Sequence, residues 1–364
     1  MMQFTIREIA KALGAEAAGD LEMCVSRANE PGLAGSDDLA LAMSPKYAEA
    51  LDQGQARAAM LWQGADWQAM GLTAAIFAPR PRMAMSGLTA MMDPGQGFGS
   101  GIHPSAVIDP SAELGENVSV GPLAVISAGA KIGAGSVIGP HCFVGQDAEL
   151  GQGAFLREMV SIGARARIGD RFIAQPGARI GGDGFSFVTP EMSGVEVARQ
   201  TMSDAGQTKA QAWARIHSLG AVEIGDDVEI GANTTIDNGT VRSTQIGNGT
   251  KIDNLVQVGH NVRVGRDCLL CGQAGIAGST VIGDNVVLGG QTGVADNLTI
   301  GDGVISGAGT MILSNAPAGR FLLGYPAVKM ALHTEMYKAQ RRLPRLFRDV
   351  ATLKKAVFKR DGND

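Results

Sequence analysis

The sequence predicts a mainly β protein, in which a central parallel β-helix is flanked by an N-terminal α/β domain and C-terminal helices. Three observations support this fold class. Aliphatic residues recur every six positions, glycine occupies 51 of 364 positions, and aromatic residues make up only 5%. A globular core generally relies on aromatic bulk, so this composition indicates many tight turns and thin, regular layers.

The six-residue period extends through residues 102 to 300. From Ile102 to Ile180 a step of six meets fourteen positions, and thirteen of them hold Ile, Leu or Val. After an interruption the register returns and, with one slip of four residues, continues to Ile300. This period is neither the 3.6 of a helix nor the alternation of an ordinary strand. It predicts short strands joined by turns, three to a coil of 18 residues, with the coils stacked into a parallel β-helix.

The regions outside the repeat define the other predicted domains. Residues 1 to 94 have mixed helix and strand character and begin with an amphipathic helix over MMQFTIREIAKALG. Residues 95 to 101 are expected to form a linker. The β-helix is expected over 102 to 325, with a polar, alanine-rich external loop inserted at about 188 to 220.

The C-terminal region, residues 326 to 364, is predicted to be helical and basic. Pro344 is expected to separate two short helices. From Ala331 to Asp364 the chain has nine Lys/Arg and four Asp/Glu, a net of +5 within a total of −5, so the remainder carries −10. A basic tail on an acidic body indicates an anionic partner for the tail. Arginines recur there at spacings of three and four, which places them on one helix face: Arg341, Arg342, Arg345 and Arg348.

Several function classes are disfavoured. No apolar run approaches the roughly 18 to 20 residues needed to span a bilayer, and the N-terminus has no hydrophobic signal core. We therefore expect a cytoplasmic protein without a transmembrane segment. Cys268 and Cys271 form C-x-x-C, but neither a second pair nor a metal-spaced histidine accompanies them, so no metal site is expected.

His260 falls at a corner of the predicted coil, two residues after an inward aliphatic position. Adding 18 residues reaches Gly278, and another 18 reaches Asp296, which precedes Asn297. In the opposite direction, with the slip allowed for, the same edge reaches Asp237. Successive coils are about 4.8 Å apart, so this edge brings together a base, a bare backbone amide and polar side chains. The alternative is that His260 caps a corner or packs in a subunit contact.

Specific motifs favour a catalytic role. GGDGFSF, TTIDNG, KIDNLVQVGHNVRVG, the SPKY segment and the helical C-terminus resemble the UDP-3-O-(3-hydroxyacyl)glucosamine N-acyltransferases of lipid A synthesis, a hexapeptide-repeat family. The resemblance covers essentially the whole chain except the insertion. It implies left-handed coils and a homotrimer. The related UDP-N-acetylglucosamine O-acyltransferases lack the N-terminal domain, so residues 1 to 94 favour the first family.

The resemblance also implies catalytic roles. His260 would be the general base that removes a proton from the 2-amino group of UDP-3-O-acylglucosamine as it attacks a 3-hydroxyacyl thioester on acyl carrier protein. Imidazole suits this task because its pKa lies near working pH. The Gly278 amide would contact the tetrahedral intermediate, and Asp237 and Gln257 would orient the base and substrate. No bound cofactor is implied, because the phosphopantetheine-linked carrier is a co-substrate.

The substrate-binding residues implied by the resemblance depart in part from the family pattern. The uracil-contact pattern Phe-x-x-Asn-x-x-Tyr is Leu41, Ser44 and Tyr47 here, so only the tyrosine remains for stacking. Asp183 and Phe185 of GGDGFSF are also assigned to substrate binding. Tyr47 could instead be a core aromatic, and a corner-turn aspartate is the alternative for Asp237.

The residues that would contact the thioester and the acyl chain also depart from the family pattern. Asn297 replaces a second histidine of many relatives, so its amide would polarise the thioester or contact the phosphopantetheine. Methionines that limit acyl length in some relatives are replaced by Ala308 and Thr310, which leaves the chain length open.

The arginine face has a partner in this interpretation, because acyl carrier protein is acidic and a basic helix can steer it. A solvated face that helps trimer packing is the alternative. Nucleic acid is disfavoured, because the acidic body would repel it.

Other functions stay open at this point. One is an acyl-CoA-dependent N- or O-acyltransferase acting on another nucleotide sugar, and another is a non-catalytic trimeric scaffold. A metal-dependent hexapeptide enzyme would need three converging histidines, but His141, His217 and His260 lie in different registers.

Overall fold

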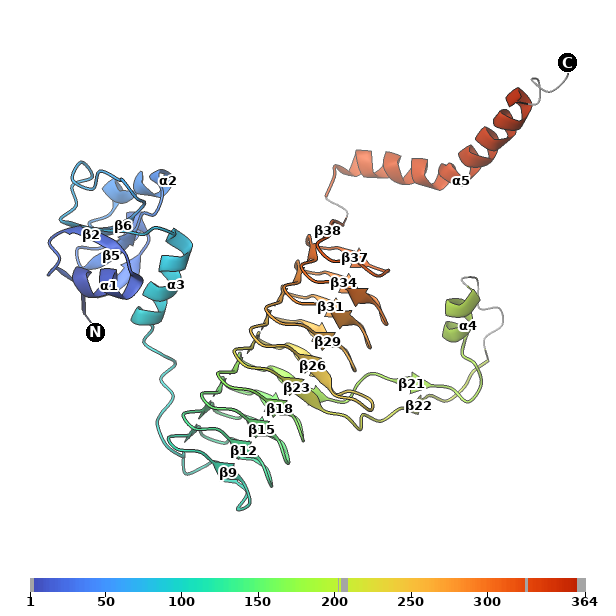
Figure 1. Cartoon of the computed structure of the whole chain (residues 1–364), viewed down its shortest axis with the longest axis horizontal. Coiled ribbons are helices and arrows are strands. Elements are labelled where there is room, and N and C mark those ends of the chain that lie inside the picture. The colour runs from blue at the N-terminus through green and yellow to red at the C-terminus, as the bar shows by residue number, and fades with distance from the viewer. Residues whose placement is uncertain (1–2, 202, 204–208, 325–326, 359–364) are drawn as a thin grey trace. The chain divides into compact units, whose positions relative to one another are not determined.

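The computed structural model describes residues 3–201, 203, 209–324 and 327–358, called the described residues below. The chain divides into two compact units, Met1–Phe98 and Gly99–Asp364. Figure 1 shows a small α/β unit and a long stack of coils. The predicted boundary between residues 325 and 326 lies outside the described residues.

The N-terminal unit contains a five-stranded sheet in the order β2-β7-β6-β5-β4. β2 is antiparallel to β7, and the other neighbours are parallel. The elements of the unit are β1 Phe4–Thr5, α1 Ile6–Leu13, β2 Glu16–Gly19, β3 Cys24–Val25, β4 Arg27–Asn29, the 3₁₀ turn Pro31–Leu33, β5 Asp38–Leu41, α2 Pro45–Ala48, the 3₁₀ turn Leu51–Gln53, β6 Ala58–Leu61, β7 Ala74–Phe77 and α3 Pro81–Met92.

The predicted amphipathic helix is α1, and its ends are capped by the sequence. The Thr5 hydroxyl accepts from the Glu8 N–H at 3.1 Å while the Glu8 carboxylate accepts from the Thr5 N–H at 2.8 Å. This reciprocal pair satisfies two of the amide donors left free at a helix start. Gly14 closes the helix with φ 58°, a conformation that costs glycine little. The buried face of the helix packs Ile6 and Ile9 into the core of the unit.

The second unit is a three-sided solenoid of short parallel strands. The first face consists of β10 Ser119–Val120, β13 Val137–Ile138, β16 Phe155–Leu156, β19 Ile173–Ala174, β24 Glu229–Ile230, β27 Lys251–Ile252, β30 Leu269–Leu270, β33 Val287–Leu288, β36 Ile305–Ser306 and β38 Phe321–Leu322. The second face consists of β8 Val107–Ile108, β11 Val125–Ile126, β14 Phe143–Val144, β17 Ser161–Ile162, β20 Arg179–Gly182, β25 Thr235–Asp237, β28 Gln257–Val258, β31 Gly275–Ile276, β34 Gly293–Val294 and β37 Met311–Ile312. The third face consists of β9 Glu113–Leu114, β12 Lys131–Ile132, β15 Glu149–Leu150, β18 Arg167–Ile168, β23 Val222–Ile224, β26 Thr244–Ile246, β29 Arg263–Val264, β32 Val281–Ile282 and β35 Thr299–Ile300.

The hexad residues form the core of the solenoid, as predicted. From Val120 to Ile300 every hexad position is at most 5% exposed, because one aliphatic side chain per strand points into the coil. Ile102 is 56% exposed, since it lies at the open start of the stack. The fold class predicted from the sequence, a mainly β hexapeptide-repeat β-helix with an N-terminal α/β part, is confirmed.

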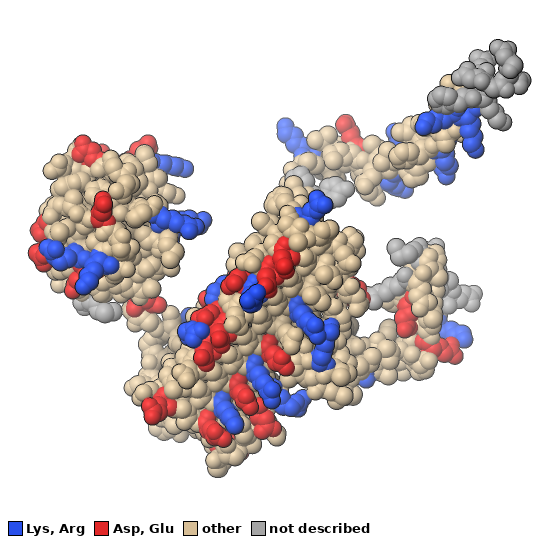
Figure 2. Space-filling model, viewed as in Figure 1, with Lys and Arg blue, Asp and Glu red and all other residues tan. Residues whose placement is uncertain are grey.

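Outward-facing side chains of the third face form a ladder of alternating charge. The ladder is Glu113, Lys131, Glu149, Arg167 and Glu223, each in register with the next on adjacent coils. Acidic and basic side chains alternate along the solenoid in Figure 2. Opposite charges directly across a strand pair stabilise it modestly, so the ladder supports the register of the coils.

The insertion forms an arm with its own secondary structure. β21 Phe187–Val188 pairs antiparallel with β22 Ala214–Arg215, and α4 Gly194–Thr201 lies between them in the chain. The insertion was predicted as an external loop, and the hairpin and helix within it were not predicted. A helix signal was present, because Ser193 and Glu196 form the S-x-x-E pattern of a capping box.

The C-terminal region contains one helix, α5 Met330–Phe358, with Pro344 inside it. The prediction of two helices separated by Pro344 was wrong. A proline removes one backbone hydrogen bond and bends a helix, but it need not end it, and α5 is visibly bent in Figure 1. None of the helices among the described residues is both long and apolar enough to span a bilayer.

Candidate active site

His260 lies at the corner between the second and third faces, just after β28. Strand register brings Gly278 to the same corner one coil further on and Asn297 to the next. The Ser279 N–H donates to the His260 carbonyl at 2.9 Å, and the Asn297 N–H donates to the Gly278 carbonyl at 3.1 Å. One coil before His260, β25 ends at Asp237. The structure therefore brings these four predicted residues to one edge.

The imidazole of His260 lies directly against Gly278. A Cβ on Gly278 would be 2.6 Å from the imidazole Cε1 and 2.7 Å from Nε2. Only glycine leaves this space to the ring. No acceptor among the described residues takes the Gly278 N–H. The corner thus combines a titratable ring with the backbone N–H of the glycine against which that ring packs.

Gly184 covers His260 from the side of the arm. A Cβ on Gly184 would be 2.7 Å from the His260 Cβ. The Gly184 N–H donates to the Ser218 hydroxyl at 3.0 Å, which ties together the beginning and the end of the arm. Neither Gly184 nor Ser218 was predicted from the sequence to lie at the site, although Gly184 is within the GGDGFSF motif.

Asn261 contacts the other nitrogen of the ring. Its Nδ2 donates to His260 Nδ1 at 3.2 Å, while its Oδ1 accepts from the Thr240 N–H at 2.6 Å. The amide is thereby oriented by the backbone, and its donor end faces the imidazole. Asn261 adopts φ 60°, which asparagine tolerates better than most residues. Asn261 follows His260 directly in the sequence, but the sequence alone gives no reason to expect this contact.

Asp237 and Gln257 form a hydrogen-bonded pair near His260. Gln257 Nε2 donates to Asp237 Oδ2 at 3.0 Å, and the Thr235 hydroxyl donates to Gln257 Oε1. Burial raises the pKa of the Asp237 carboxyl, while the Gln257 hydrogen bond and the charge of His260 act to lower it. The pair therefore places a partly desolvated carboxyl near the imidazole.

Asn238 anchors the point where the arm leaves the solenoid. Its side chain is buried, with Nδ2 donating to the Gly181 carbonyl at 2.9 Å and the backbone N–H donating to the Gly182 carbonyl at 2.7 Å. β20 has a register shift here, and Gly181 has φ 86°. This role of Asn238 could not be predicted from the sequence, because the bulge is not visible in the hexad pattern.

The Asn297 side chain reaches the edge but bonds within its own corner. It is exposed, and its Nδ2 donates to Asp296 Oδ2 at 3.2 Å. Its backbone has φ 58°, like that of Asn261 two coils earlier at the same corner. The amide is therefore on the same edge as His260 without a contact to the ring.

Ala308 and Thr310 lie at a different corner, between the first and second faces. Thr310 is 5% exposed and its hydroxyl donates to the Gly307 carbonyl at 2.7 Å, so it faces the interior of the coil. The neighbouring Met311 faces outward on the second face, where its thioether lies 2.8 Å from a Cβ built on Gly293. The structure does not bring Ala308 and Thr310 to the edge of His260.

Asp183 and Phe185 lie on either side of Gly184 at the start of the arm. Asp183 is exposed, and Phe185 is 85% exposed. The Phe185 ring packs edge-to-face against Phe187 with centroids 5.1 Å apart. Both predicted residues are therefore next in sequence to the glycine that lies against His260.

The predicted uracil-contact residues lie together in the N-terminal unit. Leu41 ends β5, and Ser44 and Tyr47 flank the start of α2. The Ser44 carbonyl accepts from the Tyr47 N–H at 3.0 Å. The Tyr47 ring is 58% exposed, so it is not a core aromatic.

The four predicted arginines lie exposed along α5. The Arg341 guanidinium lies over the Tyr337 ring at 5.9 Å from its centroid. Arg345 pairs with Asp349 at 3.8 Å, one helical turn away. Most of the cationic face is therefore available to an anionic partner.

The cysteine pair has the character of structural thiols. Burial raises the pKa of the Cys268 and Cys271 thiols. The described part of the chain holds no cluster of three His, Cys, Asp or Glu side chains able to bind a metal ion.

A protein-family model agrees with the repeat of the solenoid. The bacterial transferase hexapeptide (six repeats) model matches residues 111–146 and 243–278. A solved Arabidopsis UDP-N-acetylglucosamine acyltransferase is 23% identical with a TM-score of 0.49, covering 61% of this chain and 71% of that one.

Two curated relatives match over nearly the full length. The UDP-3-O-acylglucosamine N-acyltransferase of Ruegeria pomeroyi is 75% identical over 98% of this chain and 99% of its own. The enzyme of the same name from Paracoccus denitrificans is 60% identical over 98% of both chains. The similarity therefore includes the N-terminal unit, the solenoid and the C-terminal region.

Proposed function

This chain belongs to the family of the UDP-3-O-acylglucosamine N-acyltransferases, and we propose that it transfers a 3-hydroxyacyl group from acyl carrier protein to the 2-amino group of UDP-3-O-acylglucosamine. The reaction would be a step of lipid A biosynthesis. The observation that carries the proposal is the contact between the His260 imidazole and Gly278.

The reaction is a direct attack on a thioester. The amine nitrogen forms a bond to the acyl carbon, His260 accepts a proton from that nitrogen, and the carbon–sulfur bond breaks. The phosphopantetheine sulfur leaves and receives the proton as a thiol. General-base assistance of this kind contributes about 10²- to 10⁴-fold. No covalent intermediate on the protein is required.

The Gly278 amide is the proposed donor to the oxyanion. As the carbonyl carbon becomes tetrahedral its oxygen gains negative charge, and a fixed N–H stabilises that charge more than the neutral ground state. The lack of a side chain at Gly278 lets the substrate approach this N–H. The absence of another acceptor among the described residues supports its availability.

Asp237 is proposed to stabilise the protonated imidazole. A carboxylate close to His260 favours the positive charge that forms when the ring takes the amine proton. Gln257 would hold the carboxylate through its 3.0 Å hydrogen bond. Asn297 is proposed to contact the phosphopantetheine, since it is exposed one coil beyond Gly278.

Nucleotide binding is assigned to the N-terminal unit. An exposed tyrosine can stack on a uracil ring, and Tyr47 has the required exposure. Leu41 and Ser44 at the adjoining strand end and helix start are proposed to complete the contact. The name of the curated relatives, which specifies a UDP-linked substrate, supports this assignment.

Acyl carrier protein and further copies of the chain are the proposed protein partners. The cationic face of α5 would attract an acidic carrier. Exposed aliphatic side chains line the corner between the first and second faces, which supports burial in a homotrimer: Leu123, Met159 and Leu255. The cytoplasmic location expected from the sequence stays a prediction.

The test is transfer of 3-hydroxyacyl groups of several lengths from the carrier to UDP-3-O-acylglucosamine. We expect activity in the wild type, a loss of about 10²- to 10⁴-fold in His260→Ala, and no loss in His103→Ala, an exposed histidine outside this corner. Near-full activity of purified His260→Ala would refute the general-base role. Activity with acyl-CoA but with no carrier-bound donor would favour a CoA-dependent transferase.

A further inference from the structure

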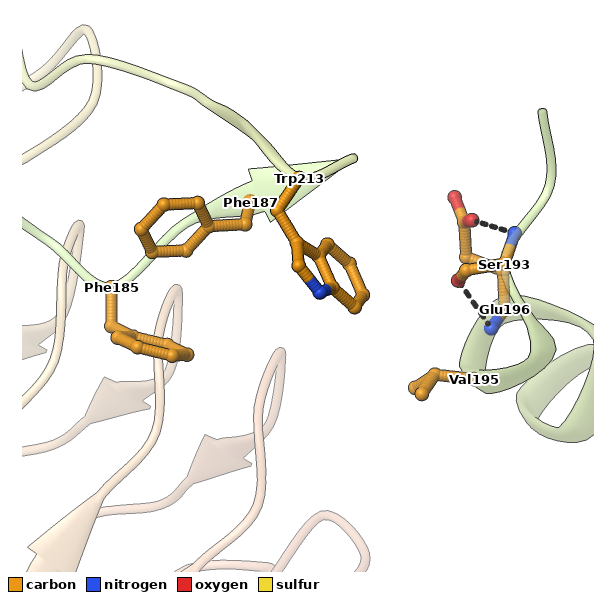
Figure 3. Close-up of a pocket in the computed structure, with 6 residues that line it drawn as sticks. All are labelled: Phe185, Phe187, Ser193, Val195, Glu196 and Trp213. Atoms are coloured by element: carbon orange, nitrogen blue, oxygen red, sulfur yellow. Dashed lines mark hydrogen bonds between the residues drawn. The ribbon is translucent and has the colours of Figure 1, made fainter. Parts of the chain in front are cut away.

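The arm carries an apolar hollow of about 710 Å³, formed between its hairpin and α4. Figure 3 shows Phe187 and Trp213 next to each other on the hairpin side, with Val195 projecting toward them from α4. The residues that line it are Phe185, Phe187, Ser193, Val195, Glu196 and Trp213. This volume is in the range of small-molecule sites, about 300 to 1,000 Å³.

The lining exposes large aromatic surface. Phe185 is 85% exposed and Trp213 is 60% exposed, in a chain with only 5% aromatic residues. Contiguous exposed apolar surface of this kind generally marks a binding site. The Arg215 guanidinium lies over the Phe187 ring at 4.6 Å from its centroid, which holds that ring in place.

The polar groups of the lining already bond to each other. The Glu196 carboxylate accepts from the Ser193 N–H at 2.7 Å, and the Ser193 hydroxyl accepts from the Glu196 N–H at 3.2 Å. These bonds cap the start of α4. A ligand in the hollow therefore meets aromatic and aliphatic surface, with few polar groups in need of a new partner.

The hollow begins next to the catalytic corner. Gly184 touches His260, Phe185 follows it in the chain, and Phe187 contacts Phe185. At no more than about 3.5 Å per residue, Phe187 is within roughly 10 Å of Gly184 along the chain. The hydrogen bond from Gly184 to Ser218 fixes the base of the arm at this point.

We propose that this hollow binds a fatty acyl chain of the reacting molecules, with the polar end of that chain at His260 and its methyl end toward α4. The proposal rests on the proposed function, because the acceptor named for the relatives carries an acyl chain. The Glu196 carboxylate disfavours an anionic ligand at the α4 end, which fits the neutral methyl terminus. The chain would come either from the acceptor or from the donor.

Binding is tested without turnover through Trp213 fluorescence. The chain has three tryptophans, and Trp62 and Trp67 belong to the N-terminal unit. UDP-3-O-acylglucosamine should shift the emission of the wild type but not that of Trp213→Phe. UDP-glucosamine, which has no acyl chain, should not cause this Trp213-dependent shift. A shift with acylated carrier but not with acylated acceptor would identify the donor chain as the ligand. An equal response to acylated and unacylated compounds would overturn the proposal.

Kinetics give a second, independent test. Trp213→Ala and Val195→Asp should raise KM for long-chain substrates by roughly tenfold or more, because each removes apolar contact with the chain, and should change KM for short chains little. Val188→Ala is the matched control, since Val188 is exposed on the same hairpin but does not line the hollow.

Two results would count against the acyl site specifically. An effect of Trp213→Ala on KM that is equal for all chain lengths would refute the acyl site. A change of oligomeric state in that variant would also refute it, because the hollow would then be an interface between copies. A wild type without transferase activity would refute the proposed function instead, and the fluorescence result would still decide whether acyl chains bind.

Discussion

The imidazole of His260 occupies the position that a side chain on Gly278 would need, with Nε2 2.7 Å from a Cβ built there. The two residues are 18 apart in the sequence and adjacent in space, because each coil returns the chain to the same corner. The position of the His260 side chain therefore depends on the lack of a side chain at Gly278 in the next coil.

Gly278→Ala should displace the imidazole and obstruct the N–H that is proposed as the oxyanion donor. We expect kcat/KM to fall by about 10²-fold or more, the loss typical of one oxyanion-hole donor. The core is untouched, so the midpoint of thermal unfolding should change little. Steady-state kinetics and circular dichroism measure the two effects.

The matched control is Gly275→Ala, three residues earlier in strand β31 of the same coil. A Cβ there meets no atom within 4 Å, so we expect a much smaller loss. Equal losses in the two variants would contradict the specific contact between residues 278 and 260.

Asn261 is predicted to set the tautomer of the base. Its amide donates to Nδ1 at 3.2 Å, which favours the tautomer with the proton on Nε2. Asn261→Asp would offer an acceptor to Nδ1 and still accept from the Thr240 N–H, so Nε2 would be free to take the amine proton. We expect kcat to be maintained or raised severalfold in Asn261→Asp, and to be lowered in Asn261→Leu because the ring then loses the hydrogen bond that orients it. A large loss in the aspartate variant would make Nδ1 the accepting nitrogen.

The repeating part of the chain could be predicted because each coil obeys the same local rule. One inward aliphatic per strand and a tight turn after it determine the position of every corner, so counting by 18 linked His260 to Gly278 correctly. The same arithmetic gave the order of Asp237, His260 and Asn297 along one edge.

The non-repeating contacts could not be predicted in this way. Gly184 reaches His260 through the register shift at Gly181, which breaks the hexad. The contact of Asn261 depends on a left-handed backbone that directs its side chain toward the ring. Pro344 lies within a helix, because the packing and hydrogen bonds on either side of a proline determine whether it bends or ends the helix.

Asp237 should make stability depend on pH. Burial raises the pKa of its carboxyl above the usual 3.8, so the folded chain retains this proton to higher pH than the unfolded chain does. The stabilisation is fully present below the ordinary value and is lost as pH rises through the raised pKa. In Asp237→Asn the free energy of unfolding should therefore change less with pH over this window. The same substitution should lower kcat. Denaturant titrations at a series of pH values measure it, with exposed Glu113→Gln as control, and an unchanged slope in Asp237→Asn would refute it.

The charge ladder predicts a salt-dependent effect. Glu149 lies in register with Lys131 on one side and Arg167 on the other. Glu149→Lys would create three adjacent positive charges and should destabilise the solenoid by about 0.4–2 kcal/mol, from two cross-strand pairs of about 0.2–1 kcal/mol each. Added salt should reduce the loss. Glu113→Lys has only one such neighbour and should lose about half as much, and equal losses at low and high salt would exclude an electrostatic cause.

The cationic face of α5 should act on encounter with the carrier rather than on chemistry. Arg341→Glu together with Arg342→Glu should raise KM for acyl carrier protein by about tenfold at low salt and leave kcat nearly unchanged, because surface charges mainly alter association rates. The difference from the wild type should shrink as ionic strength rises. Lys354→Glu with Lys355→Glu reverses the same charge further along the helix and serves as the control. An unchanged KM at low salt, combined with a change in oligomeric state, would instead assign the arginines to packing between copies.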